Sequence, residues 1–222
     1  MKDRILKIFF LDFVYFILLL FIVLFSRLQI QSLLSKIQSY APELNTLNNQ
    51  NILDAQGLIS QINSLSVQAY LFIFIVIPLI IFILYILLQG YGFYLLKKEK
   101  KFLLKFSIIN LPVFIFISLL IFIPNVYLFI LVMLISYLTF FLHFHDKKRI
   151  HLTLTKFYKY FPAYLLYLIL SLLIIISLFL AYTTFSVQGN YIILLIFSII
   201  FTLLLSLYKI YLFKKFTLSK QR

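Results

Sequence analysis

Residues 161–181 read FPAYLLYLILSLLIIISLFLA, which is 21 consecutive residues without a charged side chain. A helix rises about 1.5 Å per residue and the hydrocarbon of a bilayer is about 30 Å thick, so this stretch predicts a membrane-spanning helix. Five further stretches meet the same requirement. The six predicted spans are 8–25, 69–88, 106–123, 125–142, 161–181 and 191–207. We therefore expect an all-α integral membrane protein with six transmembrane helices.

The composition of the whole chain agrees with this prediction. The 222 residues are 64% hydrophobic and 12% charged, whereas a soluble domain is about half apolar and about a quarter charged. The mean hydropathy is +1.09. Cysteine is absent, which excludes disulfides, thiolate metal sites and cysteine nucleophiles. The net charge of +14 indicates orientation in a bilayer rather than binding to nucleic acid, and we expect no nucleic-acid partner.

The distribution of positive charge predicts how the spans are oriented. Of the lysines and arginines, 18 fall before the first span, between the second and third, between the fourth and fifth, or after the sixth. Only Arg27 and Lys36 fall on the other side. Because cytoplasmic loops carry the excess of positive charge, both termini are expected in the cytoplasm, most simply at the cell membrane. The basic cytoplasmic rim should also contact anionic lipid headgroups.

The lead-in to each odd-numbered span suggests how the spans are grouped. A basic residue, apolar residues and a second basic residue precede each of them, so the chain divides into three consecutive helical hairpins at 1–97, 98–148 and 149–222. The simpler explanation is that any helix leaving the cytoplasm begins after basic residues. In either case residues 1–222 are expected to form a single membrane domain. The first span is read as an uncleaved anchor rather than a signal peptide.

The longest polar segment, 26–68, lies between the first two spans and is expected outside the cytoplasm. Apolar residues recur in it at helical spacing on both sides of a polar middle that contains Pro42. We predict that the first two membrane helices continue outward as an antiparallel helical hairpin with a thin apolar seam. Two such helices bury little apolar surface by themselves. The segment is therefore either a binding site for a protein partner or a spacer.

Histidine occurs only near the end of the fourth span, as His143, His145 and His151, with Asp146 among them. Two histidines and a carboxylate can form a metal site. The adjacent basic run at 147–149 would repel a divalent cation and instead suits a helix C-terminus at the membrane surface. We favour the interfacial interpretation and predict neither a metal nor a cofactor.

Asp12 is the single acidic residue within a predicted span. An ionisable group inside a membrane is a functional candidate, because its burial is energetically costly and such groups often form proton relays. Asp12 also lies close enough to Lys7 in sequence to reach the inner headgroup layer, so an interfacial or ion-paired role is the alternative.

Weaker polar stripes follow three of the later spans. Such stripes most often form contacts between membrane helices. If those of the fourth and fifth spans face each other, they outline a polar notch open to the cytoplasm, bordered by the end of the second span. The candidate ligand-binding residues are Asp12, Gln89, Ser136, Thr139, His143, Tyr160, Tyr164 and Tyr167. The sixth span carries a third stripe at Ser198, Thr202 and Ser206.

Functional motifs are absent from the sequence. It contains no phosphate-binding loop, no nucleophile elbow and no HExxH motif. Our leading interpretation is an accessory, scaffold or membrane subunit of a larger assembly, without catalysis of its own. The alternative is a small-solute or lipid transporter or permease component that uses the notch. A lipid-modifying enzyme built on His143, Asp146 or His151 is the third.

Overall fold

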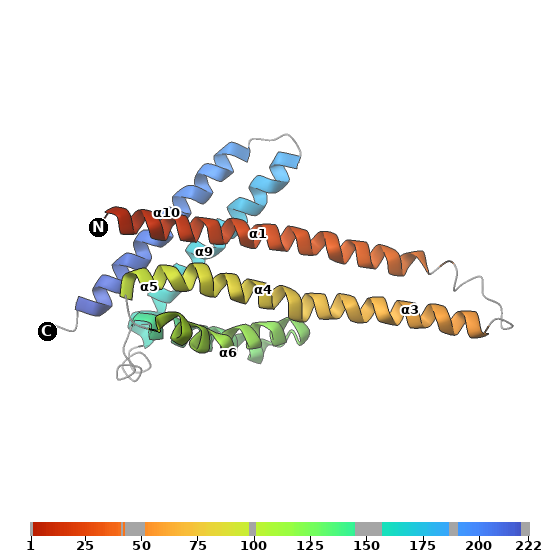
Figure 1. The fold of residues 1–222 in the computed structure, drawn as a ribbon. Coiled ribbons are helices and arrows are strands. Elements are labelled where there is room, and N and C mark those ends of the chain that lie inside the picture. The colour runs from red at the N-terminus through yellow and green to blue at the C-terminus, as the bar shows by residue number, and fades with distance from the viewer. Residues whose placement is uncertain are drawn as a thin grey trace. The chain divides into compact units, whose positions relative to one another are not determined.

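The computed structural model describes residues 2–40, 42, 52–97, 101–144, 157–186 and 191–218, and within these ranges the chain is helical apart from short turns and contains no strand (Figure 1). The α-helices are α1 (Lys2–Ser39), α3 (Ile52–Leu71), α4 (Ile77–Leu84), α5 (Tyr91–Lys97), α6 (Phe102–Phe122), α7 (Val126–Phe144), α9 (Phe157–Ser186) and α10 (Tyr191–Leu218). Two short π-helices, η1 (Phe72–Val76) and η2 (Tyr85–Gly90), connect α3, α4 and α5 into one continuous helical rod.

Five helical stretches are long and apolar enough to cross a membrane. They are Asp3–Ser39, Gln56–Lys97, Phe102–Leu120, Tyr160–Phe185 and Tyr191–Lys215. A sixth apolar stretch, Val126–Leu142, is slightly shorter and at about 1.5 Å per residue would extend for about 25 Å. This is the character of a multi-pass membrane protein. All six predicted spans fall on these helices, although the number that cross a bilayer stays a prediction.

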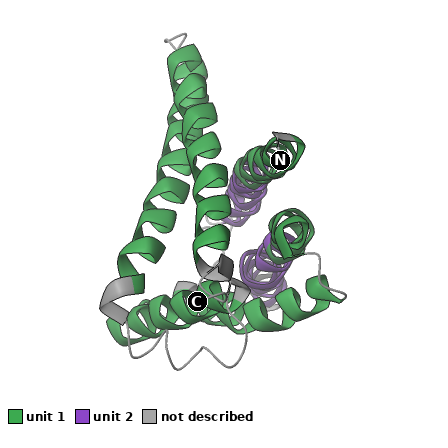
Figure 2. Ribbon diagram, turned by 90° about the vertical axis from the view of Figure 1, so that its left-hand side faces the viewer, with its two compact units in different colours: residues 1–20, 82–222 green, residues 21–81 purple. Residues whose placement is uncertain are grey.

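The chain divides into two compact units (Figure 2). Unit 1 comprises residues 1–20 and 82–222, and unit 2 comprises residues 21–81. This division describes packing within the chain and does not test the expectation of a single membrane domain, which stays a prediction.

Unit 1 is built around packed helix pairs. α6 packs against α7, and α9 packs against α10 over much of their length (Figure 1). These are the pairs that the second and third predicted hairpins require. Two apolar clusters fill the spaces between helices. The first consists mainly of aromatic residues and comprises Phe93, Phe102, Phe106, Tyr137, Phe140, Phe141, Tyr164 and Leu212. The second comprises Tyr15, Phe16, Ile174, Leu178 and Leu205.

The long rod of α3, α4 and α5 changes its helical pitch twice. Proline lacks a backbone N–H and its ring collides with the carbonyl four residues earlier, so a proline inside a helix requires a local adjustment. Pro78 lies in the first turn of α4, immediately after η1. The wider π-turn η1 precedes Pro78 and is such an adjustment. The second π-turn, η2, contains Gln89 and Gly90.

Unit 2 contains the outer part of α1 and all of α3. α1 runs without interruption to Ser39, so the first predicted span does continue as a helix beyond residue 25. Leu34 and Ile59, two residues of the predicted apolar seam, are 48% and 49% exposed, and the seam stays a prediction. Apart from Pro42, the polar middle at 41–51 lies outside the described residues.

Unit 1 has an apolar exterior and polar groups inside it. Ile108, Leu165 and Ile196 are exposed, whereas Asp12 and Gln89 are buried. The other buried polar side chains of this unit are Asn110, Thr139, Ser177, Ser198, Thr202, Ser206 and Lys209. Such a distribution reverses that of a soluble domain, in which charged groups are almost always at the surface.

Candidate functional site

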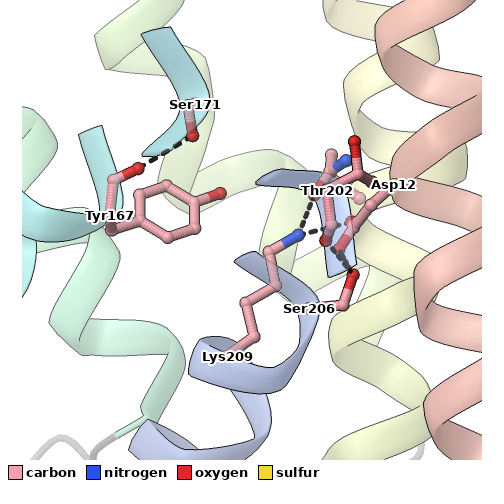
Figure 3. Close-up of polar contacts among 7 residues, drawn as sticks. Asp12, Tyr167, Ser171, Thr202, Ser206 and Lys209 are labelled. Atoms are coloured by element: carbon pink, nitrogen blue, oxygen red, sulfur yellow. Dashed lines mark hydrogen bonds and ion pairs between the residues drawn. The ribbon is translucent and has the colours of Figure 1, made fainter. Parts of the chain in front are cut away.

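A buried ion pair joins the first and last helices of unit 1. The Lys209 ammonium of α10 lies 2.5 Å from Oδ1 of Asp12 in α1 (Figure 3). Asp12 is fully buried and Lys209 is 2% exposed. Ser206, one turn before Lys209, donates a hydrogen bond of 2.7 Å to the other carboxylate oxygen of Asp12. Each carboxylate oxygen therefore has a donor, which is the condition under which a buried charge is tolerated.

Aromatic rings complete the environment of the Lys209 ammonium. It lies 5.4 Å from the ring centroid of Phe93 and 5.8 Å from that of Tyr167. A cation near the face of an aromatic ring is attracted by the ring quadrupole, and this attraction is strongest where water is excluded. The ammonium is thus held by one carboxylate, by two rings and by a neutral amide, that of Gln89.

Gln89 connects the ion pair to the interior of the unit. Its side chain is 2% exposed, and Oε1 accepts a hydrogen bond from the Lys209 ammonium. An ammonium group can only donate, so the amide oxygen must face Lys209 and the amide nitrogen must face away. Among the described residues, Nε2 of Gln89 is the buried side-chain polar atom without a hydrogen-bond partner.

The π-turn η2 determines where Gln89 lies. Insertion of a residue into a helical turn shifts the residues after it around the helix axis, and such turns are frequent at functional sites. The next residue, Gly90, is in close contact with α6, because a Cβ atom there would lie 2.9 Å from Cδ1 of Phe106. The combination of a wide turn and a glycine brings the backbone of the rod close to α6 at the position of Gln89.

A cavity of about 240 Å³ lies next to Gln89. It is bounded by α1, α6, α7, α9 and the η2 turn, all in unit 1. None of its lining residues is charged. They are Tyr15, Phe16, Leu19, Tyr85, Gln89, Asn110, Val113, Phe114, Ile117, Ser136, Thr139, Phe140, Tyr164, Tyr167, Leu168, Ser171 and Ile175. The cavity can accept a small molecule that is mostly apolar, in contact with a few fixed polar groups.

Four of the hydroxyl groups that line the cavity have hydrogen-bond partners within the protein. Ser136 of α7 is hydrogen-bonded to the hydroxyl of Tyr164 in α9. Thr139 donates to the carbonyl of Ser136. Ser171 donates to the carbonyl of Tyr167. The polar stripes predicted on the fourth and fifth spans therefore meet between α7 and α9.

Of the eight residues singled out from the sequence, the structure describes the side chains of seven. Five of them, Gln89, Ser136, Thr139, Tyr164 and Tyr167, line the cavity. Asp12 does not line it, but contacts Lys209, which contacts Gln89.

Tyr160 and His143 stand apart from this group. Tyr160 packs against Phe141, with 5.6 Å between ring centroids, and is not a lining residue of the cavity. The His143 backbone lies in the last turn of α7, but its side chain is outside the described part. His145, Asp146 and His151 also lie outside the described residues. The choice between a metal site and an interfacial role for this cluster therefore stays a prediction from the sequence. In the part of the chain that the structure describes, no three His, Asp or Glu side chains gather as a metal site would need.

Sequence reasoning missed the role of Lys209, which it counted only among the basic residues after the sixth span. In the structure the Lys209 side chain, on α10, is buried. A signal was present in the sequence. Ser198, Thr202 and Ser206 recur at a spacing of four residues, and Lys209 follows three residues later on the same helix face. Ser198 belongs to the same buried stripe and contacts Ser177 of α9 at 2.8 Å.

Fold and site together define a class: a helical protein with apolar helices of membrane-spanning length, a buried ion pair and a cavity lined by uncharged residues. No protein-family model matches the chain, and no curated protein or solved structure shows significant similarity to it. Function must therefore be argued from the site itself.

Proposed function

We propose that this protein binds a small molecule inside its membrane-spanning helical bundle, as a component of a small-solute or lipid transport system. The observation that carries the proposal is the unpaired amide nitrogen of Gln89 beside an uncharged cavity. A buried donor without a partner costs about 1–3 kcal/mol. A bound molecule that accepts a hydrogen bond from this nitrogen would recover that cost.

The proposal includes a membrane setting with both termini in the cytoplasm of the cell. It is supported by the apolar helices, by the apolar exterior of unit 1 and by the uneven distribution of basic residues between loops. Burial of Lys209 removes one residue from the 18 basic residues of the proposed cytoplasmic side, which leaves the asymmetry intact. The remaining basic side chains would contact anionic headgroups at about 1 kcal/mol each.

An ion pair between distant helices suits a binding site of this kind. Charged groups are rare inside membranes, where they mark ligand or proton pathways or pair with one another. Asp12 and Lys209 do pair, and through Gln89 the pair is in contact with the cavity. The pair therefore orients the amide that a ligand would meet.

The first test is mild extraction of the tagged protein from its native membranes, followed by native mass spectrometry. We expect a bound low-mass molecule on the wild-type protein. Val113→Phe should remove it, because Val113 lines the cavity and a phenyl ring would occupy the empty space. The matched control is Ile115→Phe, which adds a ring to an exposed position on the same helix and should leave the bound molecule in place.

Retention of the molecule by Val113→Phe at the wild-type level would contradict binding in this cavity. The melting temperature of each variant should be recorded in the same detergent, so that loss of the ligand is separated from loss of the fold.

The second candidate is the accessory or scaffold subunit. The observation in its favour is the outer part of α1, because a helix of 38 residues is about 57 Å long and exceeds the hydrocarbon thickness by far. Leu28 and Leu34 on this part are exposed and could contact a protein partner. A stoichiometric protein partner in the same mass spectrum, with no bound small molecule, would favour this candidate over the first.

A further inference from the structure

We infer that the cavity beside Gln89 takes an uncharged molecule with an apolar body about the size of one ring and a carbonyl-type oxygen that accepts a hydrogen bond from Gln89 Nε2. This inference rests on the proposed function, because it specifies the ligand of the same cavity. Four properties of the site lead to it: the donor, the charge, the volume and the lining.

The donor is fixed by its neighbour. The Lys209 ammonium donates to Gln89 Oε1, and a reversed amide would bring two donors together. Nε2 is therefore held as the free end of the amide, buried and without a partner. An acceptor atom is what this position lacks.

The charge of the ligand follows from the ion pair. None of the lining residues is charged. The nearest ions, Asp12 and Lys209, neutralise each other and have further partners in Ser206 and Gln89. A charged ligand would thus lose its hydration without gaining a counter-ion, which is strongly unfavourable in an apolar interior. An uncharged acceptor avoids this cost.

Volume and lining define the apolar body. An apolar cavity of about 150 Å³ is large enough for one benzene molecule, so the present 240 Å³ suffices for a ring with a short substituent. Aromatic side chains dominate the lining, and Phe140 and Tyr167 are themselves in ring contact at 4.7 Å between centroids. Such walls favour a planar ligand that can contact ring faces and edges.

Several other polar groups of the lining already have partners. The Thr139 and Ser171 hydroxyls donate to main-chain carbonyls, and Ser136 is bonded to Tyr164. Among the described residues, Gln89 Nε2 is the buried side-chain donor without a partner, so we assign the recognition of the acceptor to Gln89.

Photolabelling with a trifluoromethyl-diazirine derivative of acetophenone tests the inference, since this uncharged ketone with a single ring attaches to nearby groups on irradiation. The full-length protein in phosphatidylcholine–phosphatidylglycerol nanodiscs is labelled, and the modified peptides are mapped by mass spectrometry. We expect labels on cavity-lining segments of α6, α7 and α9.

Three competitors then separate shape, hydrogen bonding and charge. Acetophenone carries the ketone, α-methylstyrene has the same shape with a methylene group in place of the oxygen, and benzoate carries a charge. In the wild-type protein acetophenone should displace the label, whereas benzoate should not.

The decisive comparison is between variants in identical nanodiscs, which cancels partitioning of the competitors into lipid. Gln89→Met should weaken competition by acetophenone about tenfold and leave α-methylstyrene within about twofold. The matched control, Thr184→Val, alters a threonine of α9 outside the cavity whose hydroxyl donates to main-chain carbonyls and should change neither. If Gln89→Met does not fold, Gln89→Asn keeps an amide and withdraws it by one methylene group, and should show the same selective loss.

Equal losses for acetophenone and α-methylstyrene would overturn the inference, as would competition by benzoate or the absence of cavity labels. These failures differ from failure of the proposed function, which is decided by whether Val113→Phe loses the molecule bound in native membranes.

The source of the natural ligand is read from the same native preparation. A bound molecule that partitions into chloroform–methanol comes from the membrane, and one that stays in the aqueous phase is a soluble solute. Either source fits the chemistry if the molecule is uncharged and carries an acceptor oxygen, and a charged molecule contradicts it.

Discussion

At the scale of single residues, the ion pair connects α1 and α10 through two side chains, Asp12 and Lys209, that are 197 positions apart in sequence. Its net contribution to stability depends on the comparison made. A buried pair replaced as a whole by apolar residues is often neutral, whereas removal of one partner leaves an uncompensated charge and costs about 3–5 kcal/mol. The loss of stability in each single variant therefore reflects mainly the charge of the remaining partner, which stays buried without a counter-ion.

We predict that Lys209→Met and Asp12→Asn each destabilise the protein, by about 3 kcal/mol for Lys209→Met and less for Asp12→Asn, which keeps an acceptor for the ammonium. The double variant with Lys209→Met and Asp12→Leu should lose about 2 kcal/mol less unfolding free energy than the sum of the losses for Lys209→Met alone and Asp12→Leu alone, because no unpaired charge remains. The measurement is unfolding in mixed detergent micelles, followed by circular dichroism.

Lys7→Met provides the matched control for this cycle, since Lys7 is an exposed lysine of α1, the helix that carries Asp12, and its loss should change the unfolding free energy by less than about 0.5 kcal/mol. Additive effects of Asp12→Leu and Lys209→Met would show that the two side chains are not coupled.

At the scale of elements, the π-turn η2 and the glycine that ends it bring the rod close to α6. A Cβ atom at Gly90 would lie within 3.3 Å of side-chain atoms of both Phe106 and Leu103. Phe106 is fully buried in the first aromatic cluster and has little room to move. A Cβ atom at Gly92, two residues later, would meet nothing within 4 Å.

We predict opposite effects of alanine at these two positions. Gly92→Ala should be neutral or stabilising by up to about 1 kcal/mol, since alanine is the better helix former. Gly90→Ala should destabilise by about 1–3 kcal/mol, because the added methyl group displaces Phe106 and with it the neighbours of Gln89. Melting temperatures of the two purified variants decide the matter, and a gain in stability for Gly90→Ala would contradict the close contact.

At the scale of the whole molecule, the proposed orientation in the membrane can be tested by cysteine labelling, because the chain contains no cysteine of its own. Ser35→Cys and Lys215→Cys introduce single thiols at exposed positions on opposite sides of the proposed membrane. An impermeant maleimide added to intact cells should label Ser35→Cys and leave Lys215→Cys unlabelled until the cells are permeabilised. Labelling of Lys215→Cys in intact cells would contradict the cytoplasmic location of the C-terminus.

Part of the fold follows from local properties of the chain. The length and the apolar composition of each stretch predicted helices at all six positions, because helix length and hydropathy depend on residues that are neighbours in sequence. The adjustment near Pro78 was predictable for the same reason, since proline affects the turn that precedes it. The second π-turn, at Tyr85–Gly90, has no such marker and was not predicted.

Part of the candidate site follows in the same way. The stripes on the fourth and fifth spans were visible as helical periodicity, and Ser136, Thr139, Tyr164 and Tyr167 do line one cavity. Tyr160 has the same periodicity but lies beside Phe141 instead, because a stripe continues along the helix beyond the end of the cavity it borders.

The sequence by itself determined that the chain is helical and apolar, with helices long enough to span a bilayer, and which polar residues share a helix face. Only the tertiary structure decided that Lys209 is the partner of Asp12 and that Gln89 is left with an unpaired donor beside a cavity. The physical reason is that periodicity identifies the face of one helix, whereas a contact depends on which faces of different helices meet. That choice is made by packing between segments far apart in the chain, and one sequence contains no direct record of it.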